Sequence, residues 1–84
     1  MLARRHPSED EILDWCIAYL ARTFELPPAE IDPRAKFAMD SVTSISFVVE
    51  MEEWLGFGLA PDIVYEHPTP AKLARYVAHR MGLA

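Results

Sequence analysis

One serine in this sequence stands where its hydroxyl group could do chemistry. Ser41 follows Asp40, a residue type that often caps a helix, and apolar residues at helical spacing begin directly after it. The amino end of a helix presents free backbone N–H groups and a positive dipole end, which favour a phosphate group there. Ser41 is therefore well set to carry a phosphate ester, although an Asp-Ser pair by itself usually indicates capping alone.

The other reactive side chains do not form a constellation around this serine. Cys16 lies on the apolar face of a predicted helix, where a lone cysteine is most often a small core residue. His6, His67 and His79 are too scattered for a metal site. No constellation of His and acid residues that would activate a nucleophile accompanies Ser41. We therefore expect no catalytic residue and no metal ligand, and a small hydrolase is disfavoured.

The elements that must position Ser41 are helices. Ser8 and Glu11 have the spacing of a capping box, and apolar residues recur at helical spacing until Pro27 ends the run. The pattern predicts an all-α fold, a small four-helix bundle with a long first loop. The three principal helices cover about residues 9–24, 41–55 and 70–81, and one short helix covers about 61–66.

The loop over residues 25–40 is expected to contain no regular element, because three prolines interrupt it. Its apolar residues indicate that it lies across the core: Leu26, Ile31, Phe37 and Met39. Gly82 is expected to follow the last helix. We expect a single domain over residues 1–84, with residues 1–7 disordered.

The helix over residues 41–55 carries two apolar stripes when it is projected at about 100° per residue. One stripe can be buried in a small bundle, and the other must meet another part of the chain or a partner. Acids around the stripes are typical of a docking helix, although a central helix buried on both sides is the alternative. The stripes are Phe47, Val48, Met51, Trp54 and Leu55 on one side, and Val42, Ile45 and Val49 on the other.

Composition and charge narrow the classes of function. A length of 84 residues with 51% hydrophobic residues indicates one folded domain. From Phe37 to Ala71 there are six acids and no Lys or Arg, so this part of the chain should face basic proteins; the alternative is that these acids only solvate helix surfaces. The net charge of −5 argues against nucleic acid, and no apolar run is long enough for a membrane span. The single cysteine fits a reducing cytoplasm, and we expect a cytoplasmic monomer.

Several motifs follow one another in a fixed order along the chain. They read Met39-Asp40-Ser41-Val42, then Glu52-Glu53-Trp54-Leu55-Gly56 and Leu59, then Tyr65-Glu66-His67-Pro68-Thr69, then Leu73-Ala74. With these motifs in this order, the chain resembles the acyl carrier protein family over roughly residues 9–82. The resemblance implies that Ser41 receives 4′-phosphopantetheine from coenzyme A through a phosphopantetheinyl transferase and Mg²⁺. The thiol of that arm would hold an acyl or aminoacyl group as a thioester, so the chain would be a substrate of enzymes and not an enzyme.

The resemblance also implies a recognition surface and partners. In the family, the second helix and the loop before it form the main recognition surface, and the residue at Asp40 caps that helix beside the arm. The implied partners are the transferase, an acyl-loading ligase or acyltransferase, and a ketosynthase or other downstream synthase domain. The implied docking residues are Val42, Ile45, Val49, Glu50 and Glu53.

The motifs also bear on the subfamily, and one of them departs from the family pattern. Glu-Trp-Leu-Gly and Tyr-Glu-His-Pro-Thr look like carriers of polyketide or related secondary-metabolite biosynthesis, in particular those loaded by fatty-acyl-AMP ligases. Peptidyl or aryl carriers of nonribosomal peptide synthetases share much of the pattern, and an unmodified helical interaction module is a further alternative. The family usually has glycine two residues before Asp-Ser, where this sequence has Ala38 or lacks the position. Because glycine admits backbone angles that alanine resists, the loop is expected to enter the helix differently.

Overall fold

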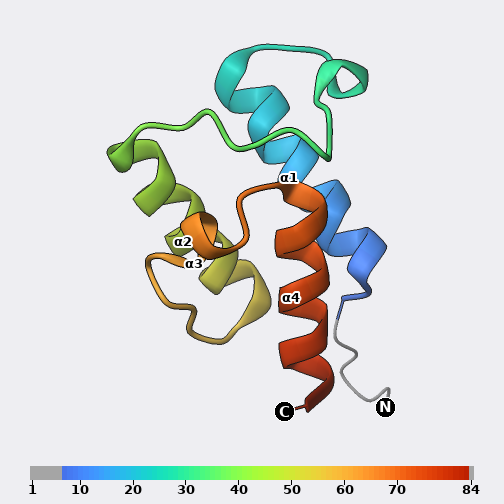
Figure 1. The fold of residues 1–84 in the computed structure, drawn as a ribbon, viewed down its shortest axis with the longest axis vertical. Coiled ribbons are helices and arrows are strands. Elements are labelled where there is room, and N and C mark those ends of the chain that lie inside the picture. The colour runs from blue at the N-terminus through green and yellow to red at the C-terminus, as the bar shows by residue number, and fades with distance from the viewer. Residues whose placement is uncertain (1–6, 84) are drawn as a thin grey trace.

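The computed structural model describes residues 7–83, and within them the chain forms an all-helical bundle without strands (Figure 1). The α-helices are α1 (Glu9–Phe24), α2 (Ser41–Leu55), α3 (Ile63–Glu66) and α4 (Pro70–Leu83). α1 and α4 pack along one another, and α2 lies across from them with the short α3 beside it. The predicted fold class is confirmed, and the bounds of α1 and α2 are those expected. No helix among these residues is long and apolar enough to cross a membrane.

Local hydrogen bonds explain where α1 begins and ends. The backbone amide of Glu11 donates to Ser8 Oγ at 3.1 Å, and the Ser8 amide donates to Glu11 Oε1 at 2.8 Å, so the capping box is complete. At the other end, Glu25 adopts a left-handed conformation with φ 55°, and the Leu26 amide donates to the Ala21 carbonyl at 2.9 Å. These bonds satisfy backbone groups that the helix itself leaves free.

Three predicted details differ in the structure. The loop contains a short 3₁₀ turn over Pro28–Glu30, because a proline at the first position supplies the required φ angle. The short helix begins at Ile63 and not at 61, since the residues before it form a turn. α4 continues through Gly82 to Leu83, two residues beyond the predicted end. The expected disorder concerns residues 1–7, of which 1–6 lie outside the described residues and Pro7 is half-buried.

The core is organised around the ring of Phe47, which is fully buried in the middle of α2. The ring centroids of Trp15, Tyr19 and Phe37 lie 5.6, 5.1 and 5.4 Å from it. Two of these rings come from α1 and one comes from the first loop, so the predicted packing of the loop across the core is confirmed at Phe37. Aromatic pairs at such distances add about 0.5–1.5 kcal/mol each beyond the burial of their area.

The remaining core is continuous from α2 to α4. Met51 and Val48 on α2 belong to the same apolar cluster as the fully buried Leu73 and Val77 of α4. Because all four helices contribute to this cluster, the orientation of α2 is fixed by burial on one side only. The side chains on the other side of α2 lie outside this cluster.

Phe47→Ala should lower the free energy of unfolding by about 3–5 kcal/mol, the usual cost of removing a fully buried ring. Chemical denaturation followed by circular dichroism measures the loss, and Phe47→Leu gives a smaller loss if the alanine variant does not fold. Tyr65→Ala is the control, because Tyr65 is 67% exposed and its loss should change stability by no more than about 0.5 kcal/mol. Equal losses for Phe47→Ala and Tyr65→Ala would contradict this account of the core.

Candidate functional site

Ser41 is the first residue of α2, and Asp40 caps the helix in front of it. The backbone amide of Thr43 donates to Asp40 Oδ1 at 2.8 Å, and the Ser44 amide donates to the Asp40 carbonyl at 2.9 Å. The amides of Ser41 and Val42 are therefore the two in the first turn that have no acceptor among the described residues. The predicted cap at Asp40 is present, and it leaves free donors beside the Ser41 hydroxyl.

The charge state of Asp40 follows from the same cap. Hydrogen bonds from the backbone amide of Thr43, and then from its side chain, hold the pKa of the Asp40 carboxyl below its ordinary value. The carboxyl is therefore ionised at neutral pH. Since its pKa is depressed on folding, its capping contribution is present above the unfolded pKa and is lost as the pH falls through the lower folded value.

The second apolar stripe of α2 is exposed beside Ser41. Val42, Ile45 and Val49 are 73%, 59% and 44% exposed, whereas most of the opposite stripe is buried. The alternative in which both sides of α2 are buried is therefore wrong. Trp54, which the pattern placed on the buried stripe, is 39% exposed and stacks on Trp15 with ring centroids 5.4 Å apart.

The acids of α2 differ in what they contact. The Tyr19 hydroxyl donates to Glu50 Oε2 at 3.2 Å, and the Leu59 amide donates to Glu52 Oε2 at 2.7 Å. Burial first, and then the Glu50 charge, raise the pKa of Tyr19, so its hydroxyl keeps the donated proton. Glu53 is exposed, and at about 100° per residue it falls on the side of Val42.

Sequence reasoning missed the role of Glu52. Its carboxylate holds the loop after α2, close to Gly58. An acid in the last turn of a helix is unfavourable for the helix dipole. That unfavourable position is the one signal in the sequence that could have indicated a specific partner.

The loop before Ser41 is held to the turn between α3 and α4 and to the first turn of α4. The Phe37 amide donates to the Pro68 carbonyl at 2.8 Å, and the Ala71 amide donates to the Pro33 carbonyl at 2.9 Å. Among residues 7–83, Glu25 is the one residue other than glycine with a positive φ, so Ala38 has an ordinary backbone conformation. The alanine therefore fits the path into α2 without strain, and no glycine is required there.

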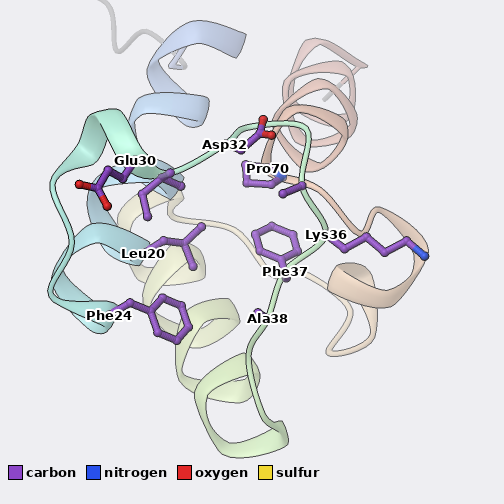
Figure 2. A pocket seen from close by; sticks show the side chains of 10 residues that line it. Leu20, Phe24, Glu30, Asp32, Lys36, Phe37, Ala38 and Pro70 are labelled. Carbon is purple, nitrogen blue, oxygen red and sulfur yellow. The ribbon is translucent and has the colours of Figure 1, made fainter.

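Two hollows flank this loop. The first, of about 200 Å³, opens between the end of α1 and the loop, and Figure 2 shows Leu20, Phe24 and Phe37 around it, with Lys36 directed away. The second, also about 200 Å³, lies toward α3 and is lined in part by Tyr65 and the buried Ser44. Lys36 and Phe37 line both hollows, and neither hollow was predicted from the sequence.

The other candidate residues lie away from this site. Cys16 is fully buried, and burial raises the pKa of its thiol to about 12, so it is a core residue as predicted. His67 stacks on Tyr76 with ring centroids 4.0 Å apart, and His79 lies on the exposed side of α4. His6 lies outside the described residues. Within residues 7–83 no group of three or more His, Cys, Asp or Glu side chains could hold a metal ion.

Comparisons with known proteins identify the family. The family described as "phosphopantetheine attachment site" matches residues 14–77, and the chain belongs to this family. It is also similar to one subunit of the phenolphthiocerol/phthiocerol polyketide synthase of Mycobacterium tuberculosis (strain CDC 1551 / Oshkosh), with 37% identity over 73 residues. That match covers 83% of this chain and 4% of the synthase polypeptide. Polyketide synthase PksL of Bacillus subtilis (strain 168) is 30% identical over 87% of this chain and 2% of its own length.

Solved structures agree with this assignment. Asl1650, an acyl carrier protein from Anabaena sp. PCC 7120 with a variant phosphopantetheinylation-site sequence, superimposes with a TM-score of 0.83 and 25% identity, over 95% of this chain and 96% of that one. A free-standing peptidyl carrier protein from Acinetobacter baumannii has a TM-score of 0.82 and 23% identity, over 88% and 96% of the two chains, which shows the shared fold. The chain is thus a carrier domain of the polyketide synthase type, and its cofactor is covalent 4′-phosphopantetheine.

Two glycine substitutions test the backbone at the two ends of the loop between α1 and α2. Ala38→Gly should lower the free energy of unfolding by about 0.5–1 kcal/mol, because glycine adds freedom to the unfolded chain and relieves no strain. Glu25→Gly should raise it by a similar amount, since Glu25 has a φ of 55° that favours glycine. Urea denaturation of both variants measures the two changes in the free energy of unfolding. A more stable Ala38→Gly would mean that the loop favours a glycine conformation.

Proposed function

We propose that Ser41 carries the 4′-phosphopantetheine arm and that the arm's thiol holds an acyl group as a thioester for delivery to partner enzymes. The observation that carries this proposal is the position of Ser41. It is exposed at the first residue of α2, beside two free backbone amides. Free amides and the positive end of the helix dipole favour the negative phosphodiester that would join the serine to the arm.

The chain's own residues hold this site but do not carry out the chemistry. Asp40 fixes the first turn and keeps its carboxylate engaged with Thr43. The coenzyme A donor, the Mg²⁺ and the catalytic groups would come from a phosphopantetheinyl transferase. We propose that the domain over residues 1–84 is a substrate of its partners and has no catalytic activity of its own, and that it works as a monomer in the cytoplasm.

The exposed stripe of α2 is the proposed docking surface for partner enzymes. It consists of apolar side chains that lie outside the core, with two acids near them, so it fits an apolar patch bordered by basic residues. The partners we propose are the transferase, an acyl-loading ligase or acyltransferase, and a ketosynthase or other synthase domain. The curated relatives are polyketide synthases, of which this chain spans only a few per cent, and this supports a polyketide pathway over a peptide one. The docking residues are Val42, Ile45, Val49, Glu50 and Glu53.

Ser41→Ala should abolish modification. The wild-type chain, incubated with coenzyme A, Mg²⁺ and a broad-specificity transferase, should gain the mass of one phosphopantetheine group by intact mass spectrometry. Ser46→Ala is the matched control, because Ser46 is also an exposed serine of α2, and it should be modified like the wild type. Modification of Ser41→Ala, or none of the wild type with several transferases including the cognate one, would refute the proposal.

Thiol counting gives an independent readout of the same modification. Cys16 is fully buried in the folded chain, and the pKa that burial raises to about 12 keeps its thiol protonated at pH 8. A thiol reagent should therefore label one group in the folded, modified wild type and none in folded Ser41→Ala. Both chains should gain one further reactive thiol on denaturation. Rapid labelling of folded Ser41→Ala would show that Cys16 is accessible.

Ile45→Asp should lower the transferase kcat/KM by about 10- to 100-fold, which corresponds to the loss of one buried apolar side chain from the complex. Circular dichroism should remain unchanged, because Ile45 lies outside the core. Ala18→Asp is the control, since it adds the same charge to the exposed side of α1 and should keep the wild-type rate. Equal rates for wild type and Ile45→Asp would exclude this stripe from the interface.

A further inference from the structure

The outer side of α4 carries cations and no acids. Lys72, Arg75 and His79 follow one another at helical spacing and are exposed, while the opposite side of the helix is buried in the core. Over residues 67–83 the sequence has three Lys or Arg and no Asp or Glu. This composition is the reverse of the acid-only part of the chain that contains α2.

Two adjoining hollows lie on this cationic side of α4. One, of about 300 Å³, lies where Arg34 of the first loop approaches Lys72 and Arg75, and Glu9 is the one acid among the residues that line it. The other, of about 360 Å³, is lined by Lys72 and Arg75 together with aromatic rings and no acid. Because both hollows share the same two cations, they form one continuous surface.

An aromatic pair forms part of the second hollow. His67 and Tyr76 stack at 4.0 Å with an interplanar angle of 19°. Arg80 donates a hydrogen bond from Nη1 to the Tyr76 hydroxyl at 2.9 Å, and its guanidinium lies 5.9 Å from the centre of that ring. These contacts hold the rings in place before any partner binds, so less side-chain entropy is lost on binding.

The helix that carries most of this surface, α4, lies away from the start of α2. Figure 1 shows the start of α2 and the whole of α4 on different sides of the bundle. A basic patch that fits the acids of α2 would be repelled by the cations of α4. A partner of α4 must therefore be of the opposite charge to the partners of α2.

We propose that this surface, the α4 basic face, binds an acidic segment of a partner polypeptide. Carboxylates of the segment would pair with Lys72 and Arg75, and one of its apolar or aromatic side chains would rest on the stacked rings. From Lys72 to Arg80 the cations extend about 12 Å along the helix, which suits several carboxylates in a row rather than a single phosphate. The α4 basic face consists of Arg34, His67, Lys72, Arg75, Tyr76, His79 and Arg80.

This contact goes beyond the carrier function. It would leave Ser41 and the exposed stripe of α2 free, so one protein could hold the carrier while another acts on its arm.

The test uses the full chain and the peptide acetyl-EELEEWLEELEE-amide as the probe. In an NMR titration, shifted amides should cluster in residues 67–80, and added salt should weaken binding. Lys72→Glu with Arg75→Glu should raise the dissociation constant about tenfold or more. Arg22→Glu with Lys36→Glu is the matched control, because it makes the same change in net charge at exposed positions and should have a smaller effect.

Several outcomes would overturn the proposal. They are equal weakening by the two double variants, shifts spread over the whole chain, and equal binding of a peptide with Gln in place of Glu. Competition by inorganic tripolyphosphate at the peptide's own affinity would show a simple anion site, and tighter binding to anionic phosphatidylglycerol vesicles would show a membrane surface. If the charge-reversed variant loses helicity, Lys72→Gln with Arg75→Gln replaces it. Both double variants should still be modified at Ser41, so failure here is distinguishable from failure of the carrier proposal.

Discussion

The burial of one side of α2 around Phe47 is the interaction on which the rest of this structure depends. Rings from α1 and from the first loop meet that side chain, and α4 closes the core behind it. Because side chains of a helix point to all sides, burial of one side fixes which residues are displayed on the other. The same contacts thus set the outward direction of Ile45 and of Ser41 at the helix start. The proposed carrier function would need this fixed display, because partner enzymes would have to recognise the exposed stripe and reach the serine in the same complex.

Helix bounds could be predicted where the signals are local. Ser8 and Asp40 cap their helices through residues three positions away, so sequence spacing suffices to place α1 and α2. The end of the last helix could not be predicted in this way. Gly82 does not end α4, because glycine ends a helix by adopting a left-handed conformation and this one keeps a negative φ. Met81, which is buried, helps to hold that last turn.

Part of the candidate site could be predicted because it, too, depends on local spacing along the chain. The serine, its cap and the two stripes follow from spacing along one helix. The roles of Glu50 and Glu52 do not, because their partners Tyr19 and Leu59 come from other elements. The hollows beside Lys72 were not predicted either, because Arg34, which lines one of them, is brought beside α4 by the fold and not by sequence proximity.

The net charge of −5 conceals two surfaces of opposite sign. The shorter extents of the bundle are 25 and 19 Å, and both exceed twice the Debye length of about 8 Å at physiological ionic strength. Exposed charges that lie on different sides of the bundle and further apart than this length are largely screened from one another. The acids around α2 and the cations of α4 can act independently, each selecting partners of a different charge. The two charge types are separated because the acids lie around α2 and the cations on α4, and the core fixes the positions of these two helices.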